Sequence, residues 1–162
     1  MHIDLAKLNF TFSSPPLLIG GMAMQYYGLR PSGADIDFVI TRADYARLAQ
    51  QYPDNLKDLW GDLGVCVFEF EIWQSICLFD YDALSQGALD PIAHCEAGYR
   101  VISLEKLLFL KALAMKIDKY HADLELIVKK IQDEKYAPWW AGLSDAQRAK
   151  YVPEPELKEA KG

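Results

Sequence analysis

The sequence has few cysteines, and their spacing excludes two common kinds of site. Cys66, Cys77 and Cys95 are odd in number, and no two of them form a Cys-x-x-Cys pair. Such a pattern indicates neither a disulfide framework nor a zinc site. We therefore expect reduced thiols and a cytoplasmic protein.

Long apolar runs and an excess of positive charge are also lacking. The longest apolar stretch, near Leu107–Met115, is interrupted by Lys111, and no basic and apolar leader pattern is found near Met1. We therefore expect no membrane span and no secretory signal. Lys and Arg number 17 against 23 Asp and Glu, a net charge of -6, which argues against nucleic-acid binding over the whole surface.

What is present is typical of a globular protein. The 162 residues are 51% hydrophobic and 12% aromatic, which is enough for a buried core. We expect one main domain over residues 1–134, which includes a C-terminal helical pair. Residues 135–162 are predicted to form a helical extension and, from Pro153, a flexible tail.

The hydrophobic pattern predicts an α/β (α+β) fold, a small mixed sheet flanked by helices and followed by the helical pair. Thr41 and Ser103 precede two of the predicted helices as N-caps. Expected strands cover residues 17–19, 35–40 and 65–73, with a short one at 101–102, and expected helices cover 22–27, 42–51, 104–117 and 118–131.

The most informative stretch is Asp35-Ile36-Asp37, which opens the apolar run Phe38–Ile40. Residues two apart on a strand point to the same face. Two carboxylates on one spot repel each other unless a cation lies between them. The pattern therefore predicts a divalent metal site at Asp35 and Asp37, with Mg²⁺ or Mn²⁺ as the ion.

A second motif lies upstream, where Leu17-Leu18-Ile19 runs into Gly20-Gly21 and a helical segment. A glycine turn that leads into a helix can present backbone N–H groups to an anion. We expect Gly20 and Gly21 to contact a phosphate.

Together, in this order, the two motifs resemble the nucleotidyltransferase superfamily that includes DNA polymerase beta. The local sequences Ile19–Ala23 and Gly28–Asp37 are similar to its minimal bacterial branch, which includes abortive-infection toxins, small toxin–antitoxin proteins and some aminoglycoside nucleotidyltransferases. The resemblance covers about residues 17–131 and is strongest over 17–40. It implies a nucleotidyltransferase-type sheet and a third metal-binding carboxylate on a neighbouring strand.

The predicted strand over residues 65–73 offers two candidates for that carboxylate. Glu71 is favoured because it lies between Phe70 and Ile72, much as the third acid of the family lies between apolar neighbours. Glu69 is the second choice. If neither has this role, both belong to a polar outer face of the strand.

Three further residues are candidates for nucleotide contact. Arg30 and Ser32 lie in the loop before the aspartates, with a simple turn role as the alternative. The segment Leu104–Leu107 with Lys111 matches a family pattern, so Lys111 is expected at triphosphate oxygens; its alternative is a surface lysine on an apolar helix. The following family motif is matched only in part, because Lys119–Asp123 has Tyr120 where Asp is usual.

The resemblance implies transfer of a nucleoside monophosphate from a nucleoside triphosphate to an acceptor hydroxyl, with release of pyrophosphate. Asp35, Asp37 and Glu71 would be the catalytic and metal-binding residues. The acceptor is open between protein, RNA and a small molecule, and a toxin–antitoxin partner is expected. The alternatives are a non-catalytic, antitoxin-like partner-binding module and an aminoglycoside-type antibiotic nucleotidyltransferase.

Overall fold

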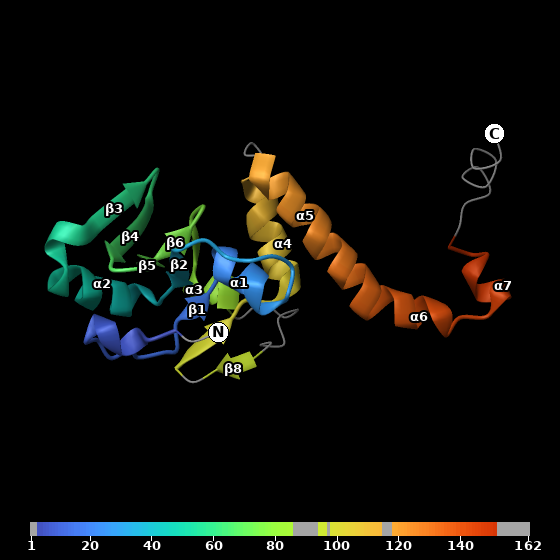
Figure 1. Ribbon diagram of the computed structural model, residues 1–162, viewed down its shortest axis with the longest axis horizontal. Coiled ribbons are helices and arrows are strands. Elements are labelled where there is room, and N and C mark those ends of the chain that lie inside the picture. The colour runs from blue at the N-terminus through green and yellow to red at the C-terminus, as the bar shows by residue number, and fades with distance from the viewer. Residues whose placement is uncertain (1–2, 86–93, 97, 115–117, 152–162) are drawn as a thin grey trace. The chain divides into compact units, whose positions relative to one another are not determined.

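The computed structural model describes residues 3–85, 94–96, 98–114 and 118–151 (Figure 1). The chain divides into two compact units, Met1–Ile127 and Val128–Gly162. The border lies inside a helix and earlier than the expected boundary after residue 134. The flexible tail predicted from Pro153 lies outside the described residues.

The strands are short and belong almost entirely to one sheet of the first unit (Figure 1). They are β1 (Leu17–Leu18), β2 (Ile36–Val39), β3 (Leu56–Leu59), β4 (Asp62–Val67), β5 (Phe70–Trp73), β6 (Ser75–Ile76), β7 (Phe79–Asp80), β8 (His94–Glu96) and β9 (Tyr99–Val101).

The helices connect the strands in the first unit and make up the described part of the second. They are η1 (Leu5–Leu8), α1 (Gly20–Tyr26), α2 (Arg42–Gln51), η2 (Pro53–Asn55), α3 (Tyr81–Ser85), α4 (Leu104–Leu113), α5 (Asp118–Ile131), η3 (Gln132–Tyr136), α6 (Ala137–Ala141) and α7 (Asp145–Arg148). No helix among the described residues is long and apolar enough to span a membrane.

The main sheet has the strand order β3-β4-β5-β2-β1-β9-β8, and β6 and β7 form a separate hairpin. Two neighbouring pairs, β2 with β5 and β1 with β9, are parallel, and the other pairs are antiparallel. The sheet is therefore mixed, and the predicted fold class is confirmed. Strand β2, which contains Asp37, is the middle strand of this sheet.

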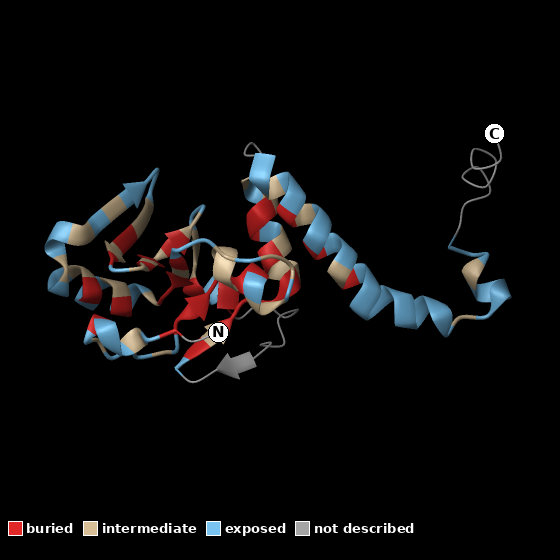
Figure 2. Cartoon of the chain, viewed as in Figure 1, coloured by how far each residue is buried: buried red, intermediate tan, exposed pale blue. Residues whose placement is uncertain are grey.

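The central strands are the most buried part of the chain, as the red segments of Figure 2 show. Phe38 and Phe70, on the adjacent strands β2 and β5, have ring centroids 6.4 Å apart. Leu107 of α4 and Ile127 of α5 have no exposed surface. This apolar core fixes β2, β5 and the two helices around the site described below.

The predicted helix starts are confirmed by their caps. The side chain of Thr41 accepts a hydrogen bond from the N–H of Asp44, and that of Ser103 accepts one from the N–H of Lys106. Each cap satisfies an N–H that lacks a partner within its helix.

The expected single strand over residues 65–73 is wrong. Strands β4 and β5 form an antiparallel hairpin instead, and Phe68 and Glu69 make the turn between them. Phe68 has a φ of 55°, in the left-handed region. An aromatic residue is rare there, and no Gly, Asn or Pro marks the turn, so the alternation of apolar residues hid it.

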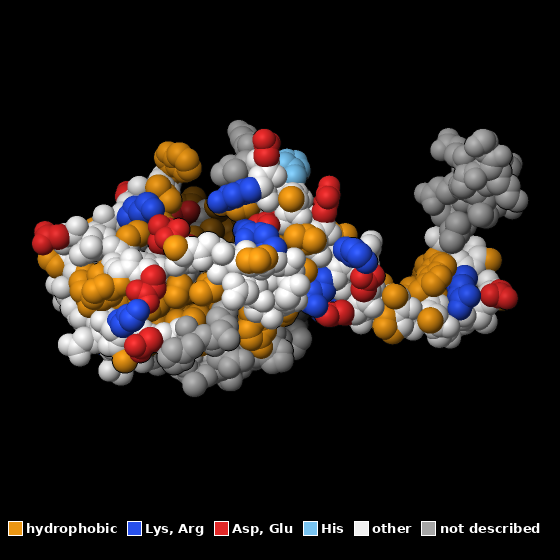
Figure 3. Space-filling view, in the orientation of Figure 1, with side chains coloured by type: hydrophobic (Ala, Val, Ile, Leu, Met, Phe, Trp, Pro, Cys, Tyr) orange, Lys and Arg blue, Asp and Glu red, His pale blue; other side chains and the backbone are white. Residues whose placement is uncertain are grey.

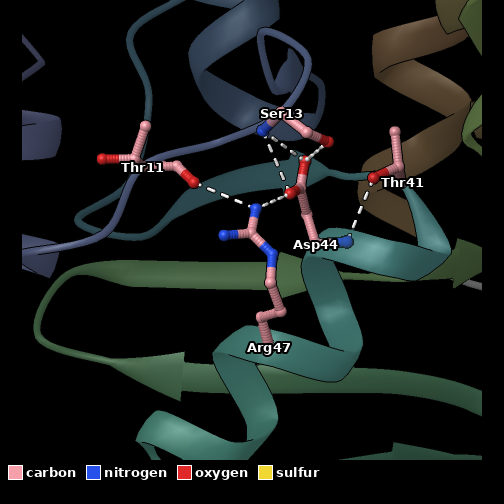
Figure 4. Close-up of polar contacts among 5 residues, drawn as sticks. All are labelled: Thr11, Ser13, Thr41, Asp44 and Arg47. Atoms are coloured by element: carbon pink, nitrogen blue, oxygen red, sulfur yellow. Dashed lines mark hydrogen bonds and ion pairs between the residues drawn. The ribbon is translucent and has the colours of Figure 1, made fainter.

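A buried carboxylate ties the N-terminal segment to α2 (Figure 4). Asp44 has no exposed surface and accepts hydrogen bonds from the backbone N–H of Ser13 at 3.0 Å and from its hydroxyl at 2.9 Å. The guanidinium of Arg47 pairs with the same carboxylate and donates to the carbonyl of Thr11 at 3.0 Å. Because several donors hold the charged form, the segment before β1 is anchored to the domain.

Candidate functional site

Strand β2 places both aspartates of the sequence motif at one cavity of about 520 Å³. Asp35 is exposed and directly precedes the strand, and Asp37 is its second residue and half-buried. The prediction that their side chains share one site agrees with this lining, whereas metal binding there remains a prediction.

We expected the two glycines to form a turn before a helix over residues 22–27. They instead belong to helix α1 itself, which begins at Gly20. Gly20 is the first residue of the helix and has a φ of +65°. A Cβ at this position would collide with Oδ2 of Asp37 and lie 2.9 Å from its Cγ. Only glycine allows this close approach of helix and strand.

Gly21 lies beside the loop before β2 and has more room. Beyond the backbone of its own helix, a Cβ there would come no closer than 3.7 Å to an atom, the backbone nitrogen of Gly33. Gly20, Gly21 and Gly33 all line the cavity, so backbone forms one of its walls.

The hairpin of β4 and β5 separates the two candidate glutamates. Glu71 is the register partner of Asp37 on the parallel strand β5, and its carboxylate lies 3.2 Å from Nζ of Lys57. Glu69 lies in the turn, where it pairs with Lys7 at 2.5 Å. Of the two, Glu71 is the one beside the aspartates.

Negative charge accumulates at this point. Burial raises the pKa of Asp37, and the charges of Glu71 and Asp35 raise it further, against a hydrogen bond from Trp73. Among the residues that the structure describes, no group of three or more His, Cys, Asp and Glu forms a set that could hold a metal ion. A metal here would take two protein carboxylates and draw its remaining ligands from water or substrate oxygens, as Mg²⁺ commonly does.

Positive side chains line another part of the same cavity, and one buried carboxylate holds two of them. Asp123 of α5 accepts from Nε of Arg30 at 2.5 Å and from Nη2 at 2.8 Å. Nζ of Lys111, on α4, lies 2.8 Å from Oδ2 of Asp123. Burial alone would raise the pKa of Asp123, but the hydrogen bonds from Arg30 and Lys111 outweigh it and hold that pKa below its usual value.

This arrangement bears on the three residues predicted to contact a nucleotide. Arg30 and Lys111 both line the cavity. The side chain of Lys111 is 8% exposed, so the alternative of a lysine extended into solvent is wrong. Ser32 is not among the lining residues, and its backbone N–H donates to Oε1 of Gln25 at 2.9 Å.

Four lining residues of α5 were not selected from the sequence, namely Lys119, Tyr120, Ala122 and Asp123. Nζ of Lys111 lies 4.4 Å from the centre of the Tyr120 ring, and Nζ of Lys119 lies 5.0 Å from it. The partial match of Lys119–Asp123 to the family motif was the available signal. Figure 3 shows acidic and basic side chains gathered around the hollow beside α4 and α5.

A second, smaller cavity of about 150 Å³ adjoins the first. Gly20, Asp37, Lys111 and Tyr120 line both cavities. The other walls of the smaller one are mainly apolar, with Leu107 and Leu110 among them. A ligand that reaches from one cavity into the other would therefore pass Asp37.

Fold and site together define an α+β protein whose main cavity combines an acidic pair, a glycine wall and a cluster of cations. No family model matches this chain, and no curated protein matches it in sequence. Among solved structures it is similar to the crystal structure of ANT(2″)-Ia in complex with adenylyl-2″-tobramycin. The TM-score is 0.49 at 16% identity, over 85% of this chain and 89% of that chain. A likeness at this level does not establish a shared family.

Proposed function

We propose that this protein is a metal-dependent nucleotidyltransferase. The observation that carries the proposal is the placement of Asp37. Asp37 touches Gly20 at the start of α1, has Glu71 beside it on β5, and shares its cavity with Arg30 and Lys111. Carboxylates for a metal and cations for phosphate oxygens therefore line a single cavity.

The chemistry is a displacement at the α-phosphorus of a nucleoside triphosphate. The oxygen of an acceptor hydroxyl forms a bond to that phosphorus, the bond to the bridging α,β oxygen breaks, and pyrophosphate leaves. In this proposal Glu71 orients the acceptor hydroxyl and takes its proton. Arg30 and Lys111 bind phosphate oxygens and offset their charge, so catalysis is mostly alignment and electrostatic stabilisation.

Asp35 and Asp37 are the residues that would hold Mg²⁺ or Mn²⁺. The ion would neutralise charge on the phosphates during transfer. Asp37 has Asp35 two residues away and Glu71 beside it, and a cation between these carboxylates would relieve their repulsion.

The test follows labelled nucleoside triphosphates, with Mg²⁺ and cell extract, into protein, RNA or small molecules. We expect labelling by the wild type and at least a 100-fold loss, an order-of-magnitude figure for a lost catalytic group, in Asp37→Asn and Glu71→Gln. Glu69→Gln is the matched control, since Glu69 pairs with Lys7 in the turn, and it should label like the wild type.

The identity of the labelled acceptor distinguishes the remaining hypotheses about the function. Label in protein or RNA fits a toxin of a toxin–antitoxin pair, and label in an aminoglycoside fits an antibiotic-modifying enzyme. No labelling with any of the four nucleotides, although metal and nucleotide bind, would favour the partner-binding alternative and refute the proposal.

A further inference from the structure

Tyr120 has an unusual place in the cavity. Its half-buried ring lines both cavities, and the ammonium groups of Lys111 and Lys119 lie over it at 4.4 and 5.0 Å. Such distances fall within the range of cation–π attraction. One ring therefore contacts two cations from two different helices.

The cations next to this ring outnumber the carboxylate that pairs with them, and the other two carboxylates that line the cavity are Asp35 and Asp37 at β2. Arg30, Lys111 and Lys119 carry three positive charges, and the adjacent carboxylate Asp123 carries one negative charge that is already shared by Arg30 and Lys111. Lys119 is exposed and makes no ion pair with any acidic residue that the structure describes. Its contact with the ring leaves its charge available to a ligand.

An aromatic ring and a carboxylate hold a lysine in different ways. A carboxylate cancels the positive charge, whereas the ring attracts the ammonium through its quadrupole and carries no net charge. At the position of Tyr120 a carboxylate would reduce the attraction of the cavity for an anion. The ring keeps the two lysines in place and keeps their charge.

We propose that Tyr120 is a positioning residue that holds Lys111 and Lys119 for the polyphosphate of the donor, and that Lys119 itself contacts that polyphosphate. The proposal rests on the proposed function and assigns the polyphosphate to the cluster of Arg30, Lys111 and Lys119. In this proposal the protein recognises the donor through its phosphates, in addition to any contact with its base.

The experiment measures binding of inorganic triphosphate by calorimetry at low salt, with the full chain and with Mg²⁺ present. We expect Tyr120→Phe to bind within about twofold of the wild type, because the ring remains. Tyr120→Leu should bind about 3- to 30-fold more weakly, the range for loss of a cation–π contact. Tyr120→Asp should bind more weakly still, because it adds a negative charge.

Two further measurements distinguish positioning from a general structural role. In Lys119→Gln, the additional change Tyr120→Leu should weaken binding less than it does in the wild type, because part of its effect acts through Lys119. With a nucleoside triphosphate in the transfer reaction, Tyr120→Leu should raise KM and leave kcat within about threefold. Tyr136→Leu is the matched control, because Tyr136 is an exposed tyrosine of the second unit, and it should match the wild type.

The outcomes separate this inference from the function on which it rests. If the wild type binds and Tyr120→Leu binds equally well, or if Tyr120→Phe is as weak as Tyr120→Leu, the inference is refuted and the proposed function stands. A wild type that binds neither inorganic triphosphate nor nucleoside triphosphates overturns both. Circular dichroism of each variant shows whether it is folded.

Discussion

Gly20 and Gly21 are adjacent in sequence but have different surroundings. The left-handed φ of Gly20 and its contact with Asp37 leave no room for a side chain. A Cβ at Gly21, in the same helix, would meet its nearest neighbours at ordinary contact distances. The pair therefore offers a substitution and its control one residue apart.

We expect Gly20→Ala to lower the free energy of unfolding by about 1 to 3 kcal/mol, the cost of a strained backbone position. The new methyl group would also displace the carboxylate of Asp37, so Mg²⁺ and nucleotide binding should weaken. Urea unfolding and calorimetric titration measure the two effects.

Gly21→Ala is the control, and it should be neutral or more stable by up to about 1 kcal/mol, because alanine favours a helix. Equal behaviour of the two variants would contradict the contact between Gly20 and Asp37. A loss of stability in Gly21→Ala but not in Gly20→Ala would also contradict this contact.

The motif residues predicted for the site were those whose signal is local, whereas Lys111 was predicted from the family resemblance. Asp35 and Asp37, and likewise Gly20 and Gly21, are close in sequence and carry a spacing that predicts a shared location. The salt bridge between Arg30 and Asp123 joins residues 93 positions apart, and no periodicity specifies it. The roles of Asp123 and Tyr120 became visible only when α4 and α5 were placed beside the loop before β2.

At the level of elements, the sequence predicted starts of helices better than turns. The caps at Thr41 and Ser103 depend on one side chain and an N–H three residues further on, so local chemistry specifies them. The hairpin turn at Phe68 and Glu69 depends on the pairing of β4 with β5. The backbone pairing of the two strands holds Phe68, whose side chain is exposed, in a conformation that its own preference opposes.

The link between α2 and the N-terminal segment should make stability sensitive to acid. Burial would raise the pKa of Asp44, but hydrogen bonds from Ser13, Arg47 and Thr41 outweigh it, and the pKa lies below the ordinary value of 3.8. A carboxyl group whose pKa is lower in the folded than in the unfolded state stabilises the fold at higher pH. Its contribution is complete above the unfolded value and is lost as the pH falls through the folded value.

We therefore expect Asp44→Asn to lower the free energy of unfolding by about 2 to 3 kcal/mol at neutral pH, because charged hydrogen bonds are lost and buried donors are left unpaired. The loss should shrink as the pH falls from the ordinary value of 3.8 through the lower folded value, because the wild type then becomes protonated as well. Urea unfolding over a series of pH values measures it. Asp54→Asn, at an exposed aspartate of η2, is the control; a loss of the same size in both variants would refute the assignment.

At the level of the whole molecule, the buried residues are confined to one part of the chain. Past Ile131, none of the residues that the structure describes is buried. The cavity with Asp37 and Asp123 lies entirely within the first unit, Met1–Ile127. The core and the candidate site therefore require no described side chain from α6 or α7.

A chain that ends after Ile131 retains all of α5 and should keep its midpoint of urea unfolding and its affinity for inorganic triphosphate. The expected midpoint change is small because stability follows buried apolar area. Unfolding curves of the shortened and full chains, recorded side by side, test this. A clear drop in the midpoint would mean that residues after Ile131 stabilise the first unit.

The salt bridge between Arg30 and Asp123, which are 93 positions apart, has a consequence for the time at which the cavity is completed during synthesis. Gly20 leaves the ribosome long before Asp123, and at ordinary translation rates the interval between them is roughly 5 to 20 s. During that interval Asp35 and Asp37 are present without the helix that carries Asp123 and Tyr120. A nascent chain therefore lacks Lys119 and the carboxylate that holds Arg30 and Lys111 in place, and we expect it to remain inert towards nucleotides until α5 has emerged.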